Sequence, residues 1–374
     1  MSSGIAHARL TPQLLEPVFQ RLEQRVRAGE VPGAALAVAD AQGTIDSRAF
    51  ALRADDRVES GAHFFLASLT KPIFATALMQ LVEEGRLHLD APVASYVPEF
   101  SGGGRETVTT WHLLTHTSGV PDTPPALIRD ERPSAKRMTE LALTSPLRFA
   151  PGTRWEYCSA SFYVMGEVMS RVSGLSYREF LQQRLFDPLE MSTTFDPRRN
   201  RRQVVPVQGV GADNAIKRYL LLRYVASIAQ PGGGLFGTLE DILRFGGAVL
   251  GPRRTERGYL PLAPETIALM SEDHTRGLPG VVEGEERRVH FGLGWNKPTL
   301  MGGLPGSPAV IGHGGATGTS LWIDPVAGLV FVYFTNQWAP DRLPELEALR
   351  GVYDALKQAG GGGEAGGAGS SAES

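Results

Sequence analysis

The feature that most constrains the fold of this chain is where its strand-like segments lie, because they occur only near the two ends. Two are predicted in the first fifty residues and three in the last seventy, at 34–39, 44–50, 309–313, 319–324 and 329–335. The turn-forming residues 40–43 join the first two into a hairpin. Between about 86 and 304, short helices alternate with loops rich in Gly and Pro. We therefore expect the two ends to share one sheet, with a mainly helical region inserted between them.

Helices are expected beside these strands. Apolar residues at helical spacing predict a helix over 13–28, and an Ala-, Leu- and Met-rich run predicts another over 72–84 that stops at Gly85. Four more are predicted at 137–143, 161–172, 177–184 and 343–358. Residues 359–374 carry no apolar side chain larger than Ala and are expected to form a disordered tail.

The composition restricts the possible partners. The 374 residues are 42% hydrophobic and 21% charged, with a net charge of −3, so neither general disorder nor a nucleic-acid-binding face is expected. Cys158 is the only cysteine, which excludes a disulfide or a thiolate metal cluster within one chain. The sequence has no basic, apolar leader and no run of about eighteen apolar residues. We expect a cytoplasmic protein that does not associate with membranes.

Ser68 and Lys71 are the first candidates for chemistry. They are three residues apart at the start of the helix predicted from Pro72, so their side chains share one face. A lysine amine can take the proton of a neighbouring serine hydroxyl and make it nucleophilic. No Gly-x-Ser-x-Gly elbow offers another activated serine. The structural alternative is that Ser68 caps the helix and Lys71 is a solvated surface residue.

Two further segments carry suitable side chains. Tyr157-Cys158-Ser159 follows a Pro-Gly turn, and His313-Gly314-Gly315 ends a predicted strand where glycines allow a ligand to approach the backbone. The alternatives are a core tyrosine at 157, a buried thiol at 158, and a strand-end histidine at 313 bonded to backbone. His112 and His116 lie four apart, but no third ligand is evident, so neither a metal nor another cofactor is expected.

Together these motifs resemble a known family. Ser-x-x-Lys, Tyr-x-Ser and His-Gly-Gly occur here in the order and approximate spacing found in class C β-lactamases, serine D-alanyl-D-alanine carboxypeptidases, D-aminopeptidases and related carboxylesterases. The resemblance spans about residues 30–337 and includes segments 113–119, 151–153, 233–238 and 291–295. It implies a β-lactamase/transpeptidase-like α/β (α+β) fold, an antiparallel sheet flanked by helices. The sheet domain would comprise 1–85 and 305–358, and the inserted helical domain 86–304.

The resemblance also implies roles for individual residues. Ser68 would form an acyl-enzyme, and Lys71 and Tyr157 would share its proton. The oxyanion would bind the N–H groups of Ser68 and Ala316.

Two departures from the family pattern bear on substrate choice. Ser159 replaces the Asn of β-lactamases and peptidases, and His313 replaces a frequent Lys, removing a fixed positive charge near pH 7. Substrate contacts are therefore expected at Ser159, His313, Gly314 and Gly315 with small molecules. We expect a carboxylesterase for small acyl esters. The alternatives are a D-amino-acid amidase, a DD-peptidase or a weak β-lactamase, and, from another class, a binding or scaffold protein with an inactive site.

Overall fold

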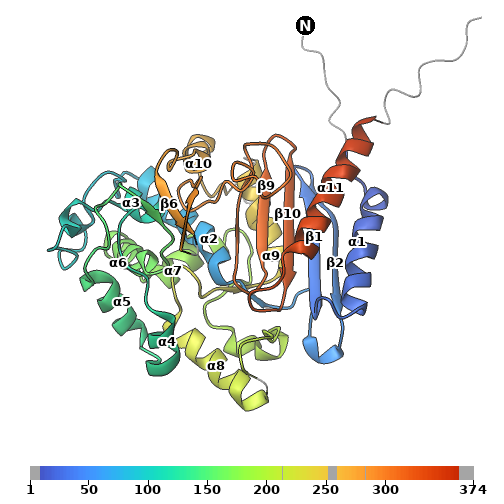
Figure 1. Cartoon of the computed structure of the whole chain (residues 1–374), viewed down its shortest axis with the longest axis horizontal. Coiled ribbons are helices and arrows are strands. Elements are labelled where there is room, and N and C mark those ends of the chain that lie inside the picture. The colour runs from blue at the N-terminus through green and yellow to red at the C-terminus, as the bar shows by residue number, and fades with distance from the viewer. Residues whose placement is uncertain (1–8, 213, 252–258, 283, 362–374) are drawn as a thin grey trace, which may run out of the picture.

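Both ends of the chain contribute to one central sheet in the computed structural model, which describes residues 9–212, 214–251, 259–282 and 284–361. The sheet has five strands in the order β2-β1-β10-β9-β8 (Figure 1), and every neighbouring pair is antiparallel. Their bounds are β1 Gly33–Asp40, β2 Gly43–Ala51, β8 Ile311–Gly314, β9 Ser320–Asp324 and β10 Leu329–Thr335. The α/β fold class with an antiparallel sheet is confirmed.

The two faces of the sheet bury different sets of side chains because successive residues of a strand point in opposite directions. Leu36 and Phe331 belong to the cluster beneath two terminal helices, whereas Ala37 and Val332 belong to the larger cluster on the other side. The terminal helices are α1 Pro12–Arg27 and α11 Leu343–Gly361, which lie side by side along the sheet (Figure 1).

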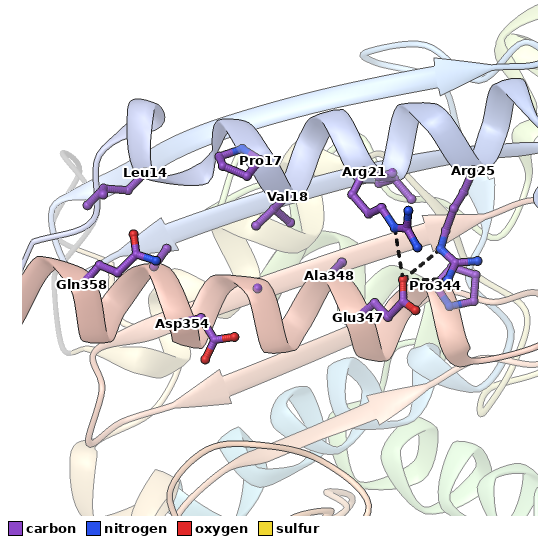
Figure 2. A pocket seen from close by; sticks show the side chains of 13 residues that line it. Leu14, Pro17, Val18, Arg21, Arg25, Pro344, Glu347, Ala348, Asp354 and Gln358 are labelled. Atoms are coloured by element: carbon purple, nitrogen blue, oxygen red, sulfur yellow. Dashed lines mark hydrogen bonds and ion pairs between the residues drawn. The ribbon is translucent and has the colours of Figure 1, made fainter.

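Helices α1 and α11 are joined by both apolar and ionic contacts. Figure 2 shows the groove of about 240 Å³ between them, where Val18 and Ala348 contribute apolar surface. At one end the Glu347 carboxylate accepts a hydrogen bond of 3.0 Å from Arg25 Nε and lies 3.7 Å from Arg21 Nε. The N- and C-terminal helices are thereby fixed to each other as well as to the sheet.

The opposite face of the sheet is covered by α9 Leu239–Leu250. This helix comes very close to the strands at Gly246, where an added Cβ would lie 2.7 Å from Val330 Cγ1 and 3.0 Å from Leu321 Cδ1. Only glycine permits this approach. A helix from the middle of the range 86–304 therefore packs directly on the sheet, and the limits of the inserted domain stay a prediction.

The central helix is α2 Thr70–Glu83, in which every residue from Thr70 to Leu81 is buried. Helices α6 Ser161–Ser173 and α7 Tyr177–Leu181 pack against it. Besides these and α9, the α-helices described between 86 and 304 are α3 Thr110–Leu114, α4 Pro125–Glu131, α5 Ala135–Thr144, α8 Ala215–Ile228 and α10 Pro264–Ser271. Two small sheets pair β3 Phe64–Phe65 with β5 Phe236–Gly237, and β4 Trp155–Glu156 with the hairpin of β6 Pro279–Val282 and β7 Glu285–Arg288.

All six predicted helices are found within three residues of their expected bounds, whereas five α-helices of the described ranges are not predicted: α3, α4, α8, α9 and α10. The helices at 137–143, 161–172 and 177–184 correspond to α5, α6 and α7, the last continuing as a π turn over Gln182–Phe186. Helix α8 is not predicted because its sequence lacks a continuous apolar stripe. In the structure it buries only Ala226 and Ile228.

The last predicted helix is longer than expected, since α11 runs to Gly361 rather than 358. The rest of the tail predicted at 359–374, from residue 362 on, lies outside the described residues. Within the described ranges, no helix has both the length and the apolar character needed to cross a membrane.

The contact between α1 and α11 gives a prediction about stability. The hydrogen bond from Arg25 holds the pKa of the Glu347 carboxyl below its usual value, so the carboxylate stabilises the folded state above the pKa of an unfolded Glu. Glu347→Gln should lower the free energy of unfolding by about 1 kcal/mol at pH 7. The difference should shrink as the pH falls below about 4. Urea unfolding followed by circular dichroism measures this.

Asp354→Asn on the same helix is the matched control. Asp354 pairs with Lys357 at 3.2 Å, but both side chains are mostly exposed, so the change should cost less than about 0.5 kcal/mol. Equal losses in the two variants would contradict a special role for Glu347.

Candidate active site

Ser68 lies in a single 3-10 turn, Ala67–Leu69, that leads directly into α2. Ala67 has φ +47°, an unfavourable left-handed conformation for a residue with a side chain. The serine is half-buried, and its hydroxyl does not cap α2, whose N-cap is Leu69. The capping alternative for Ser68 is therefore wrong, and the predicted position at a helix start is found.

Lys71 is buried, with 1% of its surface exposed, so it is not a solvated surface residue. Its Nζ donates to Ser68 Oγ at 3.1 Å, to Ser159 Oγ at 3.1 Å and to the main-chain oxygen of Gly232 at 2.8 Å. An ammonium group has three donors, and each finds an acceptor here. The structure thus brings together the first and second sequence motifs around one buried nitrogen.

Tyr157 follows β4 and is half-buried beside Lys71. Lys71 Nζ lies 4.7 Å from the centroid of the Tyr157 ring, which is a cation–π distance. The phenol oxygen forms no hydrogen bond with any described residue. The structure therefore brings the face of the ring, rather than the hydroxyl, to Lys71. Hydrogen bonds between catalytic groups often form only when substrate is bound.

The third motif lies against the segment that precedes Ser68. Thr317 Oγ1 donates to Phe65 O at 2.5 Å, and Thr319 Oγ1 donates to Leu66 O at 2.8 Å. Gly315 approaches so closely that an added Cβ would lie 2.3 Å from Leu66 O. The turn between β8 and β9 is thereby fixed to the residues just before the candidate nucleophile.

This arrangement leaves two backbone donors without partners. The N–H groups of Ser68 and Ala316 donate to no acceptor among the described residues. Ala316 is exposed, while its carbonyl is held by the N–H of Ala339 at 2.7 Å. Two unpaired N–H groups on neighbouring segments can stabilise an oxyanion. Their assignment as an oxyanion hole stays a prediction.

His313 is buried on β8 and is electrically neutral at pH 7. Burial, and then the charge of Lys71, lower its pKa to about 3, although a bond to Gly314 opposes the shift. Nδ1 lies 2.7 Å from the oxygen of Gly314, the backbone contact considered as the structural alternative. Because a carbonyl only accepts, Nδ1 carries the proton, and the buried Nε2 has no partner in the described chain. His313 supplies no cation for a substrate carboxylate.

Three residues that contact the site are not among those predicted for it. The exposed Asp122 accepts hydrogen bonds from the N–H groups of Ser159 and Ala160, at 3.2 and 3.1 Å, and so fixes the start of α6. Gly232 supplies an acceptor to Lys71, and the buried His116 packs on Tyr157. His116 lies within segment 113–119, which resembles the family, and Asp122 and Gly232 lie close to segments 113–119 and 233–238. The sequence gives no other signal for these three residues.

The remaining candidates have structural roles. His112 Nδ1 accepts a bond from the Thr109 N–H in a capping box, and the described residues contain no cluster of three or more side chains suited to a metal. Cys158 is buried, as expected, and burial raises its thiol pKa to about 12. Among the tryptophans of the core, Trp295 stacks on Phe245 with a centroid distance of 6.0 Å.

Comparison with known proteins identifies the family. A family model described as "Beta-lactamase" matches residues 18–353. The chain belongs to the β-lactamase family. The resemblance found in the three sequence motifs is therefore confirmed across most of the chain.

Proteins similar to this chain include esterases and a penicillin-binding protein homologue. Esterase EstB of Burkholderia gladioli is 29% identical, covering 86% of this chain and 89% of EstB. The structure of EstCE1, a hydrolase with promiscuous acyltransferase activity, aligns with a TM-score of 0.73 at 20% identity, covering 91% of this chain and 99% of EstCE1. A penicillin-binding protein homologue from Caulobacter crescentus gives 0.75 at 21% identity, covering 93% and 99%. The two structures support the shared fold.

The close approach of Gly315 gives a prediction that separates two neighbouring glycines of the third motif. Gly315→Ala should lower the free energy of unfolding by about 3 kcal/mol, because the new Cβ overlaps Leu66 O and the backbone must move. Gly314→Ala should change it by less than about 1 kcal/mol, since the nearest atom to its Cβ would be Thr319 O at 3.8 Å. Chemical unfolding of both variants tests this, and equal stabilities would contradict it.

Proposed function

We propose that this chain is a serine hydrolase that forms an acyl-enzyme on Ser68 and acts as a carboxylesterase on small acyl esters. The observation that carries the proposal is the buried 3.1 Å contact between Lys71 Nζ and Ser68 Oγ, beside unpaired N–H groups on Ser68 and Ala316. A basic nitrogen, a hydroxyl and oxyanion donors are the groups that acyl transfer requires. The named relatives EstB and EstCE1 are an esterase and a hydrolase.

The reaction would begin when Lys71, in its neutral form, takes the Ser68 hydroxyl proton as Oγ bonds to the ester carbonyl carbon. The carbonyl oxygen becomes negative and is stabilised by the N–H groups of Ser68 and Ala316. Collapse breaks the bond to the leaving alkoxide, which takes a proton from Tyr157, and Tyr157 regains one from Lys71. Water then attacks the acyl-enzyme by the reverse path. Lys71 and Tyr157 act as a coupled pair in both halves.

Three features favour simple esters over amides and β-lactams. The Ser159 hydroxyl is engaged with Lys71. His313 is neutral, so it places no cation on the third motif to hold a substrate carboxylate. Amides also have a poorer leaving group than esters and need more positioning. Cys158 is the only cysteine of the chain and is buried, which agrees with a cytoplasmic location, and we propose that location together with this activity.

The role of the Ser68 and Lys71 pair can be tested by replacement. Ser68→Ala should lower kcat for 4-nitrophenyl acetate by about 10⁴-fold or more without lowering the unfolding temperature. Lys71→Arg should be nearly as inactive as Lys71→Ala, because arginine stays protonated and cannot act as a base. Ser170→Ala on α6, outside the site, is the control and should keep full activity. Ester hydrolysis that survives in Ser68→Ala would refute the proposed nucleophile.

Substrate preference tests the role of Ser159. We expect kcat/KM to be at least about 10²-fold higher for 4-nitrophenyl butyrate than for nitrocefin or D-alanyl-4-nitroanilide. Ser159→Asn, whose amide can hold a substrate amide group, should raise the values for nitrocefin and the anilide. A wild type that prefers either amide-type substrate would rule out the carboxylesterase assignment. An Asn variant without any gain would show that Ser159 does not set the preference.

A further inference from the structure

His116 contacts the Tyr157 segment at three successive positions. Its main-chain oxygen accepts the N–H of Glu156 at 3.0 Å, and its Nδ1 accepts the N–H of Cys158 at 3.1 Å. Between these two bonds, the His116 and Tyr157 rings lie 4.6 Å apart by centroid, tilted by 33°. One residue, through its main-chain oxygen and its ring, therefore holds the residue before Tyr157, the ring of Tyr157 itself and the residue after it.

The backbone of His116 is held in an unfavourable conformation while it makes these contacts. Its φ is +58°, in the left-handed region, which histidine and asparagine enter more readily than most residues. The next residue is fixed at both of its main-chain polar groups, since the Thr117 N–H donates to His112 O at 2.9 Å and the Gly152 N–H donates to Thr117 O at 2.8 Å. This strain directs both a carbonyl and a ring nitrogen at the Tyr157 segment.

The protonation state of His116 follows from its bonds. Nδ1 accepts an N–H, so the proton of the neutral ring is on Nε2, and this N–H is buried without an acceptor among the described residues. Burial, and then the charge of Lys71, hold the pKa of His116 well below its ordinary value. The ring therefore stays neutral, and Nδ1 remains available as an acceptor.

Packing alone does not explain a histidine at this position. A buried N–H without an acceptor costs roughly 1–3 kcal/mol, which an apolar side chain of similar size would avoid. The ring does not relay protons either, because its single N–H is buried and faces no acceptor in the part of the chain that the structure describes. The contact that distinguishes histidine from leucine here is the bond between Nδ1 and the Cys158 N–H.

We propose that His116 is a positioning residue that fixes the ring of Tyr157 against Lys71, so that the Tyr157 hydroxyl can protonate the departing alkoxide. The proposal rests on the proposed function, because it assigns to His116 the placement of a group used in that reaction. His116 does not touch the substrate and acts only through Tyr157. Protonation of the alkoxide breaks the Tyr157 O–H bond and forms the alcohol O–H bond. Lys71 then passes the proton that it took from Ser68 to Tyr157.

The leaving group of the substrate separates this role from a general structural one. Ethoxide needs a proton to depart, whereas 4-nitrophenolate leaves without one. His116→Leu should therefore lower kcat/KM for ethyl butyrate by about 10²-fold or more, but kcat/KM for 4-nitrophenyl butyrate by less than about 5-fold, because kcat/KM reports the acylation half, in which the two leaving groups differ. His116→Asn keeps an acceptor on Cγ, where Nδ1 is attached, and tolerates the positive φ, so it should restore most of the lost activity.

A second arm uses Tyr157→Phe as the background. There, adding His116→Leu should cause no further loss on ethyl butyrate, because the group that His116 positions is gone. If His116→Leu does not fold, His116→Gln is used in its place. Its acceptor lies one bond farther from the backbone than Nδ1, so we expect the same loss on ethyl butyrate as for His116→Leu. Equal losses on both esters, or a full further loss in the Tyr157→Phe background, would overturn the proposal for His116. Failure of the proposed function would differ, since ester hydrolysis would then survive Ser68→Ala.

Discussion

The buried Nζ of Lys71 is the group on which the rest of the site depends. A buried amine must have each hydrogen satisfied by protein acceptors, and those of Lys71 come from the turn before α2, the start of α6 and the loop before β5. Segments 161 residues apart in sequence are therefore held at one point, as the positions of Lys71 and Gly232 show. Helix α2 can carry this lysine inward because nearly all of its surface is buried.

The sheet supplies the other half of the site through close backbone contacts. Gly315 and Thr319 hold the turn after β8 against Leu66, which places the exposed Ala316 on the segment next to Ser68. On the far face, α1 and α11 fix the strands from the two chain ends. The candidate site thus lies where an edge strand of a rigid sheet meets the central helix, and its geometry depends on both.

The sequence predicts those parts of the structure that follow from local pattern. The strand expected at 329–335 is found as Leu329–Thr335, and Ser68 lies at the start of its helix, because apolar runs and a proline near the helix start are local signals. The packing of α9 on the sheet, the tautomer of His116 and the bonds of Asp122 depend on residues distant in sequence. Trp322 is buried beneath α11 and donates to Glu345, which no local pattern indicates.

The central claim is that the environment of Lys71 makes Ser68 a nucleophile that forms a covalent acyl-enzyme. The most direct measurement is labelling of the folded protein with a fluorophosphonate, followed by proteolysis and tandem mass spectrometry. The account predicts one phosphonyl group per chain, attached to Ser68 and distinguished by fragment ions from the nearby Ser60. The label should be lost in Lys71→Ala. A label on another serine, or undiminished ester hydrolysis by a protein that takes no label, would contradict it.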